Sequence, residues 1–125
     1  MKKIIVTGGL GFIGSNLIEL LLKKNFFVIN IDKCTYSSNF YNTKDFIKSR
    51  KYKFFKLDIA SNKICKVFAN YKPVGIFNLA AETHVDRSID NSIKFINSNI
   101  IAVTNLLENF KQLTKKYSTK LIHVS

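Results

Sequence analysis

The sequence is poor in several residue types that mark particular classes of protein. Its 125 residues include no tryptophan, one proline and two cysteines. Cys34 and Cys65 lie far apart and fit neither a metal-ligand nor a redox spacing, and His84 and His123 are the only histidines. We therefore expect no metal site, and nothing in the sequence requires an oxidising compartment. No apolar run approaches the roughly 18 uninterrupted residues of a membrane helix. We expect a cytoplasmic protein without a membrane partner.

Acidic residues are also scarce. The chain has eight Asp and Glu residues and twenty Lys and Arg residues, which gives a net charge of +12. Such an excess suits nucleic acid, an acidic membrane or an anionic ligand. The lysines are scattered in pairs, however, without a long basic run or a nucleic-acid-binding motif. We interpret them as a solvated surface and expect no nucleic-acid partner; a nucleic-acid-binding domain would instead show an affinity that falls steeply with salt.

Hydrophobic residues make up 46% of the chain, which predicts a folded domain over residues 1–125.

The most specific pattern in the sequence lies at the start of the chain. A β-branched run, Lys3–Thr7, leads into a turn with glycines at 8, 9, 11 and 14, and an apolar helix pattern follows at once. Glycine lets the backbone turn tightly and approach a ligand, and the N–H groups that open a helix attract a pyrophosphate.

A second apolar strand, Phe27–Ile31, ends in Asp32, eighteen residues after Gly14. A carboxylate there can bind the ribose hydroxyls of an adenosine and repel a 2′-phosphate. The unit therefore predicts a dinucleotide site that prefers NAD to NADP, although Lys33 beside the acid weakens that preference. The alternative is a glycine turn with a purely structural role.

The rest of the chain alternates strands with helices. We expect a short helix within 41–50, a strand at 53–57, a helix at 61–71, a strand at 74–79, a long helix at 91–117 and a strand at 120–125. Near-continuous apolar strands predict a parallel sheet covered on both faces. The fold class is therefore α/β, a Rossmann-like sheet in the order 3-2-1-4-5 that is truncated after an exposed fifth strand.

Several polar residues within this pattern allow more than one interpretation. Asp58 follows the third strand, where it can contact adenine; its alternative is the N-cap of the following helix. His84, Asp86 and Ser88 lie too close in sequence to converge as a hydrolase triad, and no nucleophile elbow is present. Asp86, Ser88 and Asp90 are instead candidate caps of the long helix. The long helix should face the core with the apolar stripe Ile93, Phe95, Ile96, Ile100, Val103, Leu106, Leu107, Phe110 and Leu113.

Three segments carry a resemblance to a known family. The glycine turn at 7–14 resembles the signature of the extended short-chain dehydrogenases/reductases, in their nucleotide-sugar-modifying branch. Residues 30–36 and 79–89 narrow the resemblance to the dTDP-glucose 4,6-dehydratases. This resemblance implies an NAD-dependent lyase of deoxysugar biosynthesis that acts on a nucleotide sugar. It also allows a homodimer, because relatives commonly dimerise through helices of this region.

The resemblance assigns roles by matching position. The pyrophosphate would be held by Gly8, Gly11, Phe12, Ile13 and Gly14. The adenosine ribose would be surrounded by Asp32, Lys33, Cys34 and Thr35, and the adenine by Asp58 and Ile59. The nicotinamide side would be lined by Leu79, Ala80, Ala81, Thr83 and Ser98, with Thr83 also touching the sugar substrate.

The family's catalytic Thr-Asp-Glu and Tyr-x-x-x-Lys would follow Ser125 in the chain. Without them there is neither a base for the C4 hydroxyl nor an acid–base pair for dehydration. We assign no catalytic residue and expect the 125-residue chain alone to be inactive as a dehydratase. The alternatives are a non-catalytic NAD-binding module or the remnant of another nucleotide-sugar epimerase or dehydratase.

Overall fold

The computed structural model describes residues 1–34, 39–80 and 92–123, with the backbone alone for 92–99. The elements, in chain order, are β1 (Lys3–Thr7), α1 (Phe12–Lys23), β2 (Phe27–Asp32), the 3-10 helix η1 (Phe40–Thr43), β3 (Tyr52–Lys56), α2 (Ile64–Tyr71), β4 (Gly75–Asn78), α4 (Ser92–Thr114) and β5 (Lys120–His123). None of the described helices has the length and hydropathy needed to cross a bilayer.

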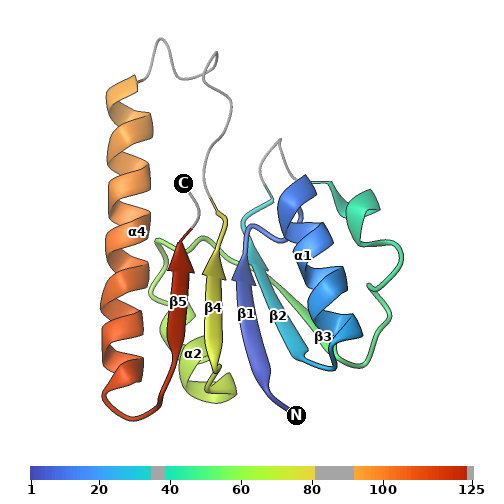
Figure 1. Cartoon of the computed structure of the whole chain (residues 1–125). Coiled ribbons are helices and arrows are strands. Elements are labelled where there is room, and N and C mark those ends of the chain that lie inside the picture. Colours follow the sequence, from blue (N-terminus) through green and yellow to red (C-terminus); the bar gives the residue numbers. More distant parts are fainter. Residues whose placement is uncertain (35–38, 81–91, 124–125) are drawn as a thin grey trace.

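The five strands form one parallel sheet in the order β3-β2-β1-β4-β5. All strands point the same way, so their carboxyl ends share one edge of the sheet (Figure 1). The chain runs outward from β1 through β2 to β3 and then returns to β4 on the other side of β1. This reversal is the place where doubly wound sheets bind their ligands. The predicted Rossmann-like fold and strand order are confirmed.

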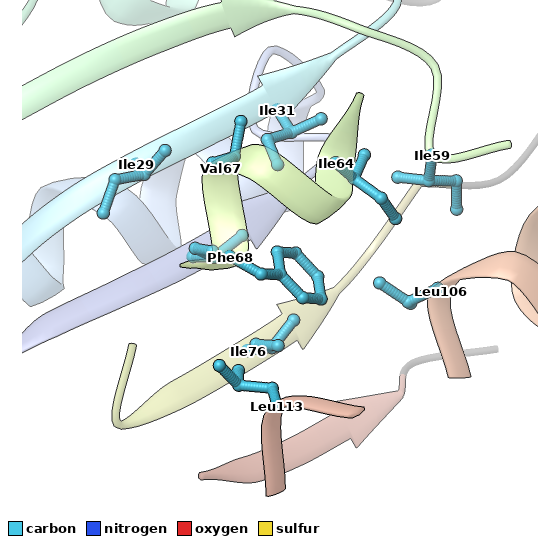
Figure 2. Close-up of a cluster of buried hydrophobic side chains, with 10 residues drawn as sticks. Ile29, Ile31, Ile59, Ile64, Val67, Phe68, Ile76, Leu106 and Leu113 are labelled. Carbon is cyan, nitrogen blue, oxygen red and sulfur yellow. The ribbon is translucent and has the colours of Figure 1, made fainter. Parts of the chain in front are cut away.

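Each face of the sheet carries its own hydrophobic core. Alternate residues of β1 point to opposite faces, so Ile4 and Val6 join the core under α1 while Ile5 joins the core on the other face. That second core lies between the sheet and the helices α2 and α4 (Figure 2). Its buried members are Ile5, Ile29, Ile31, Ile59, Ile64, Val67, Phe68, Ile76, Leu106 and Leu113.

The short helix predicted within 41–50 is present only as the 3-10 helix η1, which ends at Thr43, and turns continue to residue 48. The main-chain N–H of Asn39 and the side-chain amide of Asn42 both donate to the carbonyl oxygen of Leu10, each at 3.1 Å. These bonds hold the segment against the glycine turn, which fixes its path more strongly than helix propensity does.

The prediction for the long helix is correct in type but not in detail. Helix α4 ends at Thr114, and the next N–H groups turn back to the carbonyl of Leu113. Leu106 and Leu113 are buried, whereas Ile100 and Leu107 are 58% and 46% exposed and do not face the core. The described chain covers only one side of α4, and the helix rises beyond the ends of the strands (Figure 1).

Candidate functional site

The glycine turn is bonded to the end of β2 by successive N–H groups. The bonds run from Gly8 N to Ile31 O at 2.8 Å, from Gly9 N to Asn30 Oδ1 at 2.9 Å, and from Leu10 N to Asp32 Oδ2 at 3.0 Å. The turn is therefore a fixed structure, and these donors face the protein rather than a ligand.

The donors that open helix α1 are arranged differently. The first helical bond runs from Ser15 N to Gly11 O at 2.9 Å, so the N–H groups of Phe12, Ile13 and Gly14 have no partner within the helix. The side chains of Phe12 and Ile13 are 78% and 66% exposed, so the main chain is what these residues contribute at the turn. Three donors and the positive end of the helix dipole together suit a pyrophosphate.

At Gly8 and Gly14 a Cβ would clash with the protein backbone. Gly8 has φ of +75°, and a Cβ there would lie 2.8 Å from the backbone nitrogen of Ala80. A Cβ on Gly14 would overlap the carbonyl oxygen of Gly8 and lie 2.8 Å from Gly9 Cα. The turn thus packs backbone to backbone, both on itself and on the segment after β4. This arrangement brings the predicted pyrophosphate and nicotinamide segments together.

Asp32 lies at the carboxyl end of β2 and is buried. Its Oδ2 accepts from Leu10 N, and its Oδ1 accepts from Cys34 N at 2.8 Å. The carboxylate therefore holds the glycine turn and the chain after β2 in place. An ionised carboxylate offers about four acceptor sites, so this role is compatible with accepting bonds from ribose hydroxyls.

Cys34 adopts a left-handed backbone conformation with φ of +62°. Burial, and then the Asp32 carboxylate, raise the pKa of its thiol above the ordinary 9.0, while Lys56 opposes the shift. The thiol therefore stays neutral near pH 7 and is not an activated nucleophile. Lys33 beside it is exposed.

The loop after β3 carries the predicted adenine contacts. Leu57 N donates to Asp32 O at 3.1 Å, so Asp58 lies at the same edge of the sheet as Asp32. Asp58 Oδ1 accepts from Ala60 N at 2.9 Å, and helix α2 begins only at Ile64. The alternative of a helix N-cap is therefore wrong, because Asp58 caps the turn before the helix.

The side chain of Ile59 does not face the predicted adenine site. Its side chain is buried in the core beside Leu106 and Ile64 (Figure 2). Only the main chain of Ile59 can therefore meet an adenine.

Sequence reasoning missed a set of polar residues under the site. Thr7 Oγ1 donates to Asn78 Oδ1 at 2.5 Å and accepts from Ala80 N at 3.2 Å. Asn78 Nδ2 lies 2.8 Å from His123 Nδ1. These bonds link the carboxyl ends of β1, β4 and β5 and fix the backbone at Ala80. A polar residue inside an apolar strand, as in Phe77-Asn78-Leu79, is the signal that could have revealed them, since buried polar groups need partners.

Asn30 is a second residue of this kind. It is fully buried, accepts from Gly9 N, and donates to the Tyr52 hydroxyl at 3.0 Å. A Cβ on Gly9 would collide with this Asn30 side chain. Asn30 thus holds the glycine turn through a hydrogen bond, and the hydroxyl of Tyr52 on β3 accepts a hydrogen bond from Asn30 in turn.

Tyr52 gives the protein an expected pH dependence. Burial raises the pKa of its phenol above the ordinary 10.0, and the bond from Asn30 only partly offsets the shift. Above about pH 10 the unfolded chain loses this proton first, so the free energy of unfolding falls as pH rises. Chemical unfolding between pH 8 and 11 should show a shallower fall for Tyr52→Phe than for the wild type. Equal slopes would contradict a phenol whose partial burial keeps it neutral.

Some predicted residues lie outside the described part of the chain. Thr35, Ala81 and Thr83 are among them, as are the candidate helix caps at 86, 88 and 90. Ser98 lies on α4, where only its backbone is described. The roles of these four residues, like those of the other predicted site residues, stay predictions.

One pair matches a catalytic spacing by chance. Tyr52 and Lys56 read Tyr-x-x-x-Lys, but both lie on strand β3. Residues four apart along a strand are separated by about 13 Å, and the Tyr52 hydroxyl is bonded to Asn30. The two side chains do not form an acid–base pair.

Comparison with known proteins agrees with this geometry. Residues 5–125 match the sequence profile of the family described as GDP-mannose 4,6 dehydratase. The chain belongs to that family. Within it, 110 residues are 42% identical to the dTDP-glucose 4,6-dehydratase of Neisseria meningitidis serogroup B, over 86% of this chain and 31% of the relative. The resemblance predicted from the sequence is confirmed.

Solved structures of the same family superimpose on the whole fold. The dTDP-glucose 4,6-dehydratase of Bacillus anthracis, in complex with NAD, has a TM-score of 0.83 and 34% identity, covering 100% of this chain and 37% of its own. The enzyme of Streptomyces venezuelae, with NAD and TYD bound, has a TM-score of 0.81 and 28% identity, over 94% and 38%. The chain thus spans about a third of the length of the relatives it matches.

Proposed function

We propose that residues 1–125 form the NAD-binding part of a dTDP-glucose 4,6-dehydratase. The observation that carries the proposal is the glycine turn packed backbone to backbone, next to the three opening N–H groups of α1, which have no partner within the helix. A Cβ at Gly8 or Gly14 would clash with the backbone that forms this cradle, so both glycines are needed to keep its shape. Family membership and the NAD complexes of relatives support the same assignment.

Each part of the cofactor has candidate partners. The N–H groups of Phe12, Ile13 and Gly14 would bind the pyrophosphate, with Gly8 and Gly11 allowing close approach. Asp32, with Lys33, Cys34 and Thr35 around it, would bind the ribose, and Asp58 with the main chain of Ile59 the adenine. The nicotinamide would lie along Leu79, Ala80, Ala81, Thr83 and Ser98. Bound NAD supplies a hydride acceptor, and Thr83 would also touch the nucleotide sugar.

The chemistry of dehydration needs further groups. The printed sequence contains no Thr-Asp-Glu, and its one Tyr-x-x-x-Lys spacing lies on a strand. We infer that these 125 residues bind NAD without turning over dTDP-glucose. A homodimer through α4 remains part of the proposal, because Ile100, Ile101 and Leu107 are exposed apolar side chains on that helix.

The test is binding without turnover. Titration calorimetry of the purified 125-residue chain should detect NAD⁺ with higher affinity than NADP⁺, and NAD⁺ at a hundredfold excess over Kd should raise the free energy of unfolding by about 2.7 kcal/mol. A sensitive assay with dTDP-glucose and NAD⁺ should show no product. Absence of binding to folded protein would refute the NAD assignment, and turnover would refute the inferred inactivity.

A further inference from the structure

Helix α4 is hydrogen-bonded through the side chain of Asn105 to the loop after β3, which carries Asp58 and Ile59. The Asn105 amide nitrogen, Nδ2, donates to the carbonyl oxygens of Ile59 and Ser61 at 2.7 and 3.0 Å. Because both partners are acceptors, the amide must present its NH₂ group to the loop. Asn109, one turn further on, donates to the Asn105 carbonyl at 2.9 Å. The bond thus joins α4 to a loop about 45 residues earlier in the chain.

The two carbonyls lie within the turn that carries Asp58. Ser61 N donates to Asp58 O at 2.8 Å, and Ala60 N donates to Asp58 Oδ1. The turn therefore fixes the Asp58 carboxylate relative to Ala60. Asn105 in turn binds the carbonyls on either side of Ala60. Its hydrogen bonds thus set the position of the whole turn relative to the sheet edge.

An apolar contact anchors the same loop from the same helix. Ile59 and Leu106 are both buried in one core cluster (Figure 2). This contact is non-directional and allows the loop to rotate or slide by small amounts. The paired hydrogen bonds of Asn105 are directional, so they remove that freedom. A loss of Asn105 should thus leave the fold in place and loosen the orientation of Asp58.

We propose that Asn105 is a positioning residue that sets how the site reads the adenine ring. The inference rests on the proposed NAD site and adds a residue on α4 that contacts no cofactor atom itself. Asp58 is exposed at the loop surface, and its carboxylate can accept from the 6-amino group of adenine. Asn105 holds this acceptor where the amino group lies. The discrimination between an amino group and a carbonyl at position 6 therefore depends on Asn105.

The experiment compares NAD⁺ with its hypoxanthine analogue, in which a carbonyl oxygen replaces the 6-amino group. Calorimetric Kd values for both ligands are measured with the wild type, Asn105→Val and Thr104→Val. Thr104 is exposed on the adjacent position of α4 and serves as the matched control. The wild type and Thr104→Val should prefer NAD⁺ by about tenfold, the value of one charge-assisted hydrogen bond. Asn105→Val should lose most of that preference.

A purely structural role would lower both affinities equally and leave their ratio unchanged, and that result would overturn the proposal. A wild type that binds both ligands equally would overturn it as well. If Asn105→Val does not fold, Asn105→Thr, which has the shape of valine and keeps a single hydroxyl donor, should show an intermediate ratio; a wild-type ratio there would count against the proposal. Absence of any NAD⁺ binding to the folded wild type would instead refute the NAD site itself.

Discussion

Replacing Gly14 with alanine is expected to unfold the cradle and abolish NAD binding. The new methyl group would overlap the carbonyl oxygen of Gly8 and press on Gly9 Cα. Neither atom can rotate away, since both belong to the backbone of a turn tied to β2. We expect the free energy of unfolding to fall by about 3 kcal/mol or more, which lowers Tm by roughly 10 °C. Thermal melting followed by circular dichroism measures the change.

Two other glycines supply the controls. A Cβ on Gly75 would meet only Lys120 O at 3.8 Å, so Gly75→Ala should leave both stability and NAD affinity nearly unchanged. A Cβ on Gly11 would meet only Gly8 O at 3.4 Å. Gly11→Ala should therefore fold, yet bind NAD⁺ about tenfold more weakly if the pyrophosphate lies against the turn. A Gly14→Ala protein as stable as Gly75→Ala would disprove the account of the cradle.

Asp32→Ala is expected to damage the site in two ways. It removes the acceptor of two main-chain N–H groups, those of Leu10 and Cys34. A hydrogen bond to a charged group contributes about 1.5–3 kcal/mol, so we expect a loss of about 3 kcal/mol in the free energy of unfolding. The same change removes the proposed acceptor for the ribose hydroxyls. NAD⁺ binding should fall below detection in calorimetry.

Asp32→Asn separates the two roles. Asparagine keeps the shape and one acceptor oxygen but carries no charge, so this variant should be more stable than Asp32→Ala. It should also lose the repulsion of a 2′-phosphate, and the ratio of Kd for NADP⁺ to Kd for NAD⁺ should fall about tenfold. An unchanged ratio in folded Asp32→Asn would show that Asp32 acts only on the protein backbone.

The sequence alone predicts the fold because its signals are local and repeated. β-branched runs such as Lys3–Thr7, the glycine turn and the alternation of strands with helices each indicate the same parallel sheet. The order of strands then follows from the position of the turn. The sequence did not show how short the helix within 41–50 is, because bonds from Asn39 and Asn42 to the distant Leu10 carbonyl decide the path of this segment.

The residues of the candidate site also fall into two groups, those that the sequence identifies and those that only the structure reveals. Gly8, Gly14 and Asp32 can be identified from spacing, since spacing is what the turn and the ribose require. Asn30, Asn78 and Asn105 cannot, because their partners are 21 to 71 residues away along the chain. A polar residue in an apolar element indicates that a partner exists, and only the three-dimensional structure identifies it.

The side chains of Thr7, Asn78 and His123 form a chain of hydrogen bonds, in which each side chain is a hydrogen-bond partner of the next. An amide at position 78 is useful only while a hydroxyl lies on one side of it and an imidazole on the other. We therefore expect the three positions to covary during evolution. Across an alignment of relatives, a change at any one of them should be accompanied by changes at the other two.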